Sequence, residues 1–330
     1  MKTVRWGIAG PGRIADALAP DFLHVPHAEL VAVASRDADR ARSFADRHGV
    51  PRAHGSYRAL IDDPGVDIIY VATPHPMHHE FALAAIAAGK GLLVEKSFTA
   101  TYAGTVDVVS AAEAAGTFCM EAMWTRFQPA VVAAHEVIAW GRIGDVLGVQ
   151  GDLVAFRRFS PDDRLFAPEL GGGATLDLGV YVLAFAHDFL GRPNTVKATG
   201  RKYPNGVDAA ASVALGYPSG ATASLTYALD THGPGRMVIL GTNGWIEIEP
   251  RFHHPTTISV HRSGVLPRII EAPVAGRGYA HELIAATEAI REGRTESDEM
   301  PLSATIEVAE LMDAVLKQLG VTYAEAEGVL

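Results

Sequence analysis

A glycine motif directly after a short apolar run constrains this fold more than any other feature of the chain. Residues 4–9 (VRWGIA) are typical of a buried strand, and the next six residues read Gly-Pro-Gly-Arg-Ile-Ala. In a G-x-G-x-x-A turn, Gly10 permits the tight bend, Gly12 lets backbone N–H groups meet a pyrophosphate, and Ala15 allows close helix packing. Because a second strand-like run, residues 30–34, follows at β-α-β spacing, the pattern predicts a dinucleotide site rather than a glycine turn without a ligand. The residues expected at the phosphates are Gly10, Gly12, Arg13 and Ile14.

Strand-like and helix-like segments alternate through the rest of the first third. Strands are expected at 67–72, 91–95 and 117–120, and helices at 38–48, 78–88 and 100–115. Such alternation is typical of a parallel, doubly wound sheet, in which ligands bind beyond the carboxyl ends of the strands. The residues at those strand ends are therefore the candidates for function.

The end of the second strand indicates which cofactor binds. It reads Ala-Ser-Arg-Asp, with Ser35 and Arg36 where a cofactor without a 2′-phosphate would usually meet an acid. A small hydroxyl followed by a planar guanidinium suits a 2′-phosphate. We therefore favour NADP over NAD. Two alternatives stay open: Asp37 could reach the ribose along a slightly different loop path, and Arg36 could be a solvated surface charge.

The third and fourth strands end in two further candidate loops. Thr73 and Pro74 are followed by three histidines within five residues, at 75, 78 and 79. No carboxylate lies nearby in a familiar ligand pattern, so a loop beside a nicotinamide is a more natural interpretation than a metal site. The fourth strand ends in Glu95-Lys96. A lysine there could donate to a developing alkoxide or hold down the pKa of a neighbouring tyrosine, unless it is simply solvated.

From about residue 121 the rhythm changes to β-rich runs separated by turns. The runs are expected at 147–156, 195–201, 211–216, 221–228, 236–241 and 245–248. Because they lack long intervening helices, they predict an open, largely antiparallel sheet. Helices are expected near 279–292 and 303–319, at the end of the chain.

Three consecutive glycines, 171–173, precede the one well-marked early helix of this region, 174–190. Residues four apart share a face of a helix, so Asp177 and Tyr181 would point the same way just beyond a stretch without side chains. That arrangement could build a cleft with an acid/base pair, or it could be a tight turn followed by an ordinary helix.

Composition argues against several classes of function. With 28 basic and 38 acidic residues among 330, the chain has a net charge of −10 and no Lys/Arg cluster, so neither nucleic acid nor an anionic membrane is expected as a partner. Cys119 is the only cysteine, which excludes an internal disulfide and a thiolate metal cluster. The N-terminus enters a strand-like run at once, and no apolar stretch approaches the span of a membrane helix, so we expect a cytoplasmic protein.

These motifs, in this order, resemble the Gfo/Idh/MocA oxidoreductases over essentially the full chain. The shared features are the G-x-G-x-x-A turn, T-P-x-x-x-H at 73–78, the Glu95-Lys96 turn, and the glycine run with its D-x-x-x-Y helix. Within the family, the run 121–127 and Tyr181 are most similar to dihydrodiol dehydrogenases and the related aldose (xylose) dehydrogenases.

The resemblance implies an architecture and a reaction. We expect a Rossmann domain at 1–122, an α+β substrate-binding domain at 123–330, and a homo-oligomer, dimer or tetramer. The reaction would be NADP(H)-dependent oxidation of a sugar or cyclic polyol, with Tyr181 as acid/base, Lys96 stabilising its phenolate, and Asp177 orienting the substrate. The glycine run would permit close approach of that substrate. The residues expected around the rest of the cofactor are Ser35, Arg36, Thr73, Pro74, His78, Glu95, Lys96, Trp124 and Arg126.

Two positions depart from the family pattern. Ser97 stands where a proline is common, and Tyr181 stands where many members carry a histidine. The second departure makes the tyrosine dependent on a partner that lowers its pKa from about 10. Other functions stay open on these motifs: a trans-dihydrodiol dehydrogenase, a keto-sugar (anhydrofructose-type) reductase, a glycoside-cleaving enzyme with tightly held NAD, or a catalytically silent NADP(H) sensor.

Overall fold

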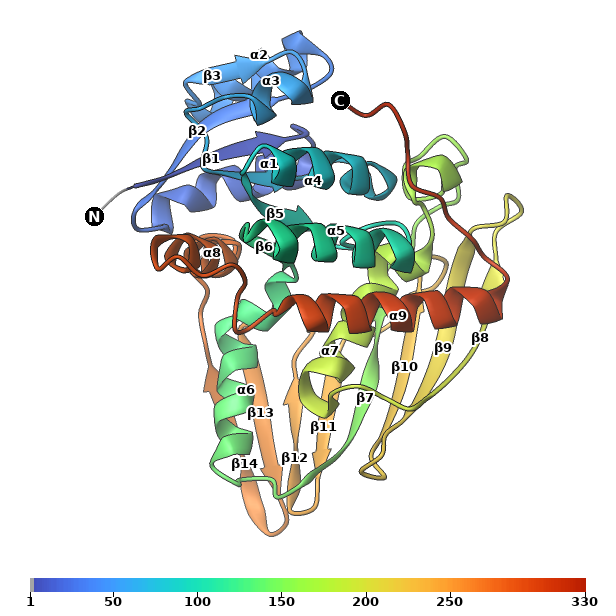
Figure 1. Ribbon diagram of the computed structural model, residues 1–330. Coiled ribbons are helices and arrows are strands. Elements are labelled where there is room, and N and C mark those ends of the chain that lie inside the picture. The colour runs from blue at the N-terminus through green and yellow to red at the C-terminus, as the bar shows by residue number, and fades with distance from the viewer. Residues whose placement is uncertain (1–2) are drawn as a thin grey trace. The chain divides into compact units, whose positions relative to one another are not determined.

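The computed structural model of the protein describes residues 3–330 and divides them into two compact units (Figure 1). Met1 and Lys2, the start of the N-terminal segment considered above, lie outside the described residues. The first unit comprises residues 3–122, 275–306 and 324–330, and the second comprises 123–274 and 307–323. The sequence analysis placed 275–306 and 324–330 with the second domain, whereas the structure groups them with the first unit.

The first unit contains a six-stranded sheet in the order β3-β2-β1-β4-β5-β6, with every neighbouring pair parallel. Its strands are β1 (Val4–Ala9), β2 (Ala28–Ala34), β3 (Arg52–His54), β4 (Ile68–Val71), β5 (Gly91–Glu95) and β6 (Cys119–Ala122). The order reverses between β1 and β4, which confirms the doubly wound parallel sheet and places its switch point after those two strands. The sequence analysis missed β3, which is only three residues long.

Some helices of the first unit begin and end at residues with clear capping chemistry. They are α1 (Arg13–Leu18), α2 (Ala38–His48), α3 (Tyr57–Ile61), α4 (His78–Ala87), α5 (Tyr102–Ala115) and α8 (Ala280–Arg291), with short 3₁₀ turns η1 (Ala19–His24) and η2 (His75–Met77). The side chains of Asp37 and Thr101 accept backbone hydrogen bonds at the starts of α2 and α5. Gly49 and Gly116 close the same helices in the left-handed conformation.

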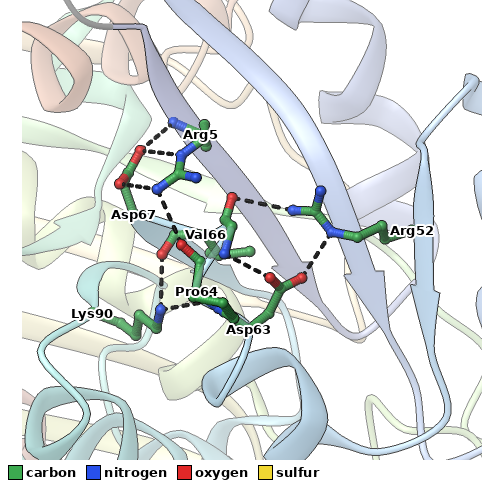
Figure 2. Close-up of polar contacts among 8 residues, drawn as sticks. Arg5, Arg52, Asp63, Pro64, Val66, Asp67 and Lys90 are labelled. Carbon is green, nitrogen blue, oxygen red and sulfur yellow. Dashed lines mark hydrogen bonds and ion pairs between the residues drawn. The ribbon is translucent and has the colours of Figure 1, made fainter.

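Ion pairs occupy the edge of this sheet where its strands begin (Figure 2). Arg5 binds Asp67 through hydrogen bonds of 2.8 and 2.9 Å, and Arg52 binds Asp63 at 2.8 Å. Lys90 donates to the backbone carbonyl of Asp63 at 2.7 Å. These side chains are thus used in holding the strand starts together, and the candidate functional residues lie at the opposite, carboxyl ends.

The second unit contains an eight-stranded sheet in the order β14-β13-β12-β11-β7-β10-β9-β8. Its strands are β7 (Val146–Val154), β8 (Thr195–Lys202), β9 (Asp208–Gly216), β10 (Thr222–Ala228), β11 (Met237–Gly241), β12 (Gly244–Ile248), β13 (Thr257–Arg262) and β14 (Val265–Glu271). Only β7 and β10 pair in parallel, which confirms the largely antiparallel sheet. The sequence analysis missed the hairpin of β13 and β14, although Gly264, in the left-handed conformation (φ 71°), marks its turn.

One face of this sheet is covered by helices (Figure 1). The helical elements are η3 (Trp124–Phe127), α6 (Pro129–Ala139), η4 (Pro168–Leu170), η5 (Thr175–Gly179), α7 (Val180–Leu190) and α9 (Leu302–Leu319), whose first residues belong to the first unit. Helix α6 packs on β12, β13 and β14, and α7 packs on β7 and β10. Along β10 buried and exposed residues alternate, so the other face of the sheet is exposed within this chain.

The segment expected as one α-helix from 174 to 190 has a more irregular start. Residues Thr175–Gly179 form a π-helical turn, and α7 proper begins at Val180. By length and composition, Pro168–Leu190 is apolar enough to cross a membrane, so the expectation that no stretch approaches such a span was wrong. Because 61% of its most apolar window is buried inside the protein, the segment is accounted for as core of the second unit.

Candidate functional site

The glycine turn after β1 has the geometry that its sequence predicts. Gly10 has a φ of 94°, and a Cβ there would lie 2.8 Å from the carbonyl oxygen of Ala72, after β4. Gly12 is the N-cap of α1, and a Cβ there would meet nothing within 4 Å. Gly10 therefore serves the packing of the turn, whereas Gly12 keeps open the space at the positive end of α1 that a pyrophosphate would use. Arg13 is exposed and Ile14 is half-buried at the start of this helix.

The carboxylate of Asp37, just after the end of β2, is already used in hydrogen bonds within the protein. Oδ1 of Asp37 accepts the backbone N–H groups of Asp39 and Arg40, at 2.9 and 3.2 Å, and so caps α2. Ser35 is buried, and its Oγ accepts the N–H of Asp37 at 3.1 Å. Arg36 is exposed and makes no hydrogen bond or ion pair with any residue in the described part of the chain. At this strand end the guanidinium of Arg36 is therefore a positive charge that pairs with no acid among residues 3–330, and the carboxylate of Asp37 is already used in capping.

A second guanidinium, which the sequence analysis missed, accompanies Arg36. Burial raises the pKa of the Tyr57 hydroxyl, and the positive charges of Arg36 and Arg40 oppose that shift. Both guanidinium groups therefore lie close enough to one hydroxyl to affect its titration. The signal in the sequence was the spacing of the two arginines, which places Arg40 in the first turn of the helix that follows Arg36.

His78 joins the loops that follow β4 and β5. Its Nε2 lies 2.8 Å from the carbonyl oxygen of Thr73, and its Nδ1 lies 3.2 Å from the carbonyl oxygens of Ser97 and Phe98. A neutral imidazole has a single N–H, which donates to the carbonyl that it faces. The fully buried ring lies between the two loops. The Oγ1 of Thr73 is buried without a hydrogen-bond partner among residues 3–330. Pro74 continues this loop, half-buried.

The three histidines of this region do not form a metal site. His78 is used between the loops, His79 pairs with Asp107 at 2.7 Å, and His75 Nε2 donates to the carbonyl of Lys96 at 3.2 Å. In the described part of the chain, no group of three His, Cys, Asp or Glu side chains could hold a metal ion. The arrangement thus favours a structural role for these rings at the switch point of the sheet.

Lys96 follows β5 on a turn that a buried carboxylate supports. Its backbone N–H donates to Glu95 Oε2 at 3.1 Å, and the hydroxyl of Tyr70, on β4, donates to Glu95 Oε1. Glu95 is buried, whereas Lys96 is only half-buried. The direct neighbour of Lys96 in the sequence therefore fixes the turn and leaves part of the lysine side chain accessible.

In the second unit, the hydroxyl of Tyr181 accepts a hydrogen bond from a buried side chain. The indole Nε1 of Trp124, on η3, donates to the phenolic oxygen of Tyr181, on α7, at 3.1 Å. The two side chains are 9% and 8% exposed. Because an indole N–H can only donate, it favours the phenolate of Tyr181 over the neutral phenol.

Two histidine rings that the sequence analysis did not single out lie beside this pair. The ring of His253 lies 5.1 Å from that of Tyr181, and the ring of His254 lies 5.4 Å from that of Trp124. Thr125 Oγ1 donates to the carbonyl of His253 at 2.8 Å, which ties this loop to η3. Burial, with the charge of Arg251, lowers the pKa of His254 and favours its neutral form.

The glycine run is explained by packing within the second unit. A Cβ on Gly172 would lie 2.7 Å from the backbone nitrogen of Ala167, and one on Gly173 (φ 124°) would collide with the hydroxyl of Tyr323. The implied reason for the glycines, close approach of a substrate, is corrected here: at these two positions a side chain has no room in the protein itself. Asp208 then anchors the π turn, accepting the N–H and the hydroxyl of Thr175 at 2.6 and 2.7 Å.

Asp177 and Arg126 each lie next to an opposite charge. Asp177 is part of the π turn, and its Oδ1 lies 3.7 Å from the guanidinium of Arg164. Arg126 is buried, donates to Nδ1 of His187 at 3.0 Å and lies 3.7 Å from Asp188. Burial lowers the pKa of His187, whose other nitrogen faces Glu307 at 2.5 Å. These contacts hold Arg126 against α7, and its expected place beside a nicotinamide stays a prediction.

Comparison with known proteins agrees with this arrangement. The oxidoreductase family with an NAD-binding Rossmann fold, Gfo/Idh/MocA, matches residues 4–123, and its C-terminal domain matches residues 131–247. The chain is 34% identical to the trans-1,2-dihydrobenzene-1,2-diol dehydrogenase of Mus musculus, over 97% of this chain and 98% of that one. It is also 34% identical to the D-xylose 1-dehydrogenase (NADP(+)) of Hypocrea jecorina, over 98% of this chain and 94% of that one.

A solved structure gives the same result for the fold. KijD10, a 3-ketoreductase from Actinomadura kijaniata in complex with NADP, is similar with a TM-score of 0.84 and 26% identity, over 98% of this chain and 99% of that one. Both units, the ordered motifs and the full-length relatives lead to one conclusion. The chain belongs to the Gfo/Idh/MocA oxidoreductases, with their NAD-binding Rossmann domain.

Proposed function

We propose that the protein is an NADP(H)-dependent dehydrogenase that acts on a carbinol of a sugar or cyclic polyol, with Tyr181 as acid/base assisted by Lys96. The observation that carries the proposal is the hydrogen bond from Trp124 Nε1 to the phenolic oxygen of Tyr181. A phenol has a pKa near 10, so it can accept a proton near neutral pH only where its environment favours the phenolate. Trp124 supplies one such donor, and Lys96 would supply a positive charge.

Four features of the first unit support a dinucleotide cofactor with a 2′-phosphate. Gly12 leaves open the space beside the α1 N-terminus, and the buried hydroxyl of Thr73 lacks a partner within residues 3–330. Arg36 and Arg40 are close to the same tyrosine hydroxyl, and the acid that would favour NAD, Asp37, caps a helix. The D-xylose dehydrogenase relative is named for NADP(+), and KijD10 was solved with NADP. We therefore infer NADP as the preferred cofactor, with NAD as the weaker alternative.

The cofactor and three residues would each have a separate role in the reaction. The bound nicotinamide would supply the hydride acceptor for oxidation of the carbinol carbon. Tyr181 would take the hydroxyl proton as the carbonyl forms and would return it in the reverse direction. Lys96 would stabilise the negative charge that develops on the oxygen, and Asp177 would orient the substrate through a neighbouring hydroxyl.

A cyclic trans-diol is a second candidate substrate. The rings of Trp124, His253 and His254 surround the acid/base with flat, weakly polar surfaces, which suit the face of a carbocycle as well as that of a pyranose. A relative over nearly the full chain is named as a dihydrodiol dehydrogenase, and KijD10 as a ketoreductase. The reaction class is shared by all three, and the substrate would differ.

The test is a turnover assay that follows NADPH formation by its near-ultraviolet absorbance. Purified protein would be mixed with NADP⁺ or NAD⁺ and a panel of aldoses, anhydrosugars and cyclic trans-diols, with Lys96→Ala as the control. We expect turnover with one substrate class, faster with NADP⁺ and lost in the variant. Binding of NADPH without turnover in either direction, using keto-sugars for the reverse, would contradict the proposal and favour a sensor.

A further inference from the structure

A buried acid that the proposed reaction does not use lies in the first unit. Glu282, near the start of α8, is 1% exposed. Neither of its carboxylate oxygens has a hydrogen-bond partner among residues 3–330. Buried carboxylates are normally paired or hydrogen-bonded, because removing their charge from water without compensation costs several kcal/mol. Glu282 therefore calls for a specific explanation.

The charged groups that act on Glu282 are negative. Asp21 and Glu95 both act on it, and all three carboxylates are buried. Asp21 is compensated by four contacts from the backbone N–H groups of Arg277, Tyr279 and Ala280 at the start of α8. Glu95 is compensated by the hydroxyl of Tyr70 and by the N–H of Lys96.

The other titratable groups around this cluster do not neutralise Glu282. Tyr70 and Tyr279 both lie close to it, and burial raises the pKa of each hydroxyl, so both are neutral phenols. Arg277 acts on Tyr279, and burial lowers the pKa of His281, the neighbour of Glu282 on α8. No ion pair joins Glu282 to a cation in the part of the chain that the structure describes.

The folded protein therefore favours the protonated form of Glu282. Burial first, and then the charges of Glu95 and Asp21, raise the pKa of Glu282 well above its ordinary value. Deprotonation would place a second, uncompensated charge beside Glu95, the residue that supports the Lys96 turn. Glu95 would then have to move away or take up a proton, and either change alters its hydrogen bond to the Lys96 backbone.

We propose that Glu282 is a positioning residue for Lys96 that acts through Glu95, holding the Lys96 turn in place only while Glu282 carries a proton. The link to catalysis rests on the proposed function, in which Lys96 serves Tyr181. The link to the turn does not, because it follows from the carboxylate cluster alone. The protein thereby has an alkaline limit that is independent of the titration of Tyr181.

The test compares the wild type with Glu282→Gln, which mimics the protonated acid, and with Glu113→Gln as a control on the exposed face of α5. A carboxyl group whose pKa is raised by folding stabilises the protein at low pH, and this stability is lost as pH rises through the folded-state pKa. We expect the unfolding temperature of E282Q relative to the wild type to rise by at least about 3 °C between roughly pH 6 and pH 9. E113Q should show no such trend.

The positioning role needs a second readout, on Lys96 itself. Acylation of Lys96 by an amine-reactive ester, followed by peptide mass spectrometry and normalised to exposed Lys317, reports the turn without substrate or cofactor. We expect the normalised rate in the wild type to change about threefold or more between roughly pH 7 and pH 9, and to stay constant in E282Q. Glu282→Met, which also lacks the charge, should behave like E282Q and serves if E282Q does not fold.

The outcomes separate this inference from the proposed function. Parallel stability and labelling profiles in the wild type and E282Q would overturn the inference, whatever the activity. The expected profiles in a protein without turnover would support the inference and contradict the proposed function. Where turnover is measured, the ratio of kcat at about pH 9 to that at about pH 7 should be higher in E282Q than in the wild type.

Discussion

The indole nitrogen of Trp124 donates a 3.1 Å hydrogen bond to the phenolic oxygen of Tyr181, and both side chains are less than one-tenth exposed. The two residues come from η3 and α7, 57 positions apart in the chain. A fixed N–H donor at the phenolic oxygen favours the phenolate of Tyr181 over the neutral phenol.

Replacing Trp124 by phenylalanine keeps a ring and removes the donor. We expect kcat to fall about tenfold to a hundredfold, since a hydrogen bond to a charged group is worth roughly 1.5–3 kcal/mol. Without the donor the phenolate is less stable and the pKa of Tyr181 is higher, so the limb on which the oxidation rate rises with pH should move to higher pH. The measurement is a pH profile of kcat, with Trp140→Phe, on the exposed end of α6, as the control. An unchanged pH profile would contradict a role of the Trp124 hydrogen bond in stabilising the phenolate of Tyr181.

Replacing Arg36 by alanine should separate the two cofactors. The loss of a guanidinium at a 2′-phosphate should weaken NADPH binding about tenfold or more and NADH binding less than about threefold. Arg40→Ala should have the same sign of effect. Fluorescence titration of both cofactors is the measurement, and Arg42→Ala, an exposed arginine paired with Asp39 on the same helix, is the matched control. Equal losses for both cofactors would contradict the 2′-phosphate assignment.

The two glycines of the first turn should respond differently to alanine. Gly12→Ala places a methyl group in open space, so the unfolding temperature should stay within about 2 °C while both cofactors bind about tenfold more weakly. Gly10→Ala forces a left-handed residue against the carbonyl of Ala72, so the free energy of unfolding should fall by about 1 kcal/mol or more. Calorimetry with cofactor titration distinguishes the two. If G12A binds cofactor like the wild type, the pyrophosphate does not approach this glycine.

Replacing Thr175 by valine should destabilise the π turn below Tyr181. The substitution removes the hydroxyl that donates a hydrogen bond to Asp208 and that also contacts the hydroxyl of Tyr227. A buried acceptor that loses its donor costs about 1–3 kcal/mol in the free energy of unfolding. Denaturant unfolding measures this loss, and Thr222→Val, on the exposed face of β10, should change stability little. Equal stabilities of the two variants would show that Asp208 does not anchor the turn.

The sequence predicted the first unit more completely than the second. Strand β5 and helix α2 have the expected ends, because the apolar runs there stop at a capping residue or a strand-end charge. The glycine turn was predictable because a G-x-G-x-x-A motif directly follows the apolar run of β1. The hairpin of β13 and β14 was missed because β14 is exposed along nearly its whole length and lacks a hydrophobic alternation.

The candidate site, too, could be predicted from the sequence only in part. The candidates Lys96, Tyr181, Asp177 and Arg36 could be named from motifs, since each stands at a fixed spacing from a glycine or a strand end. Their partners could not. Trp124 could be named but its hydrogen bond could not, and the loop of His253 reaches Tyr181 only through the tertiary fold. Glu282 has no local signal at all, because its raised pKa depends first on burial and then on Glu95 and Asp21, both remote in the sequence.

The measurement that tests the central claim most directly is the turnover of Tyr181→Phe with NADP⁺ and the best substrate of the panel. General acid/base catalysis contributes about 10²–10⁴ in rate, so kcat should fall by at least about a hundredfold while the Kd for NADPH changes less than about threefold. Tyr217→Phe, a buried tyrosine whose hydroxyl has no partner within residues 3–330, should retain the wild-type kcat. A Tyr181→Phe protein that keeps kcat within about tenfold of the wild type would contradict the assignment of Tyr181 as the acid/base.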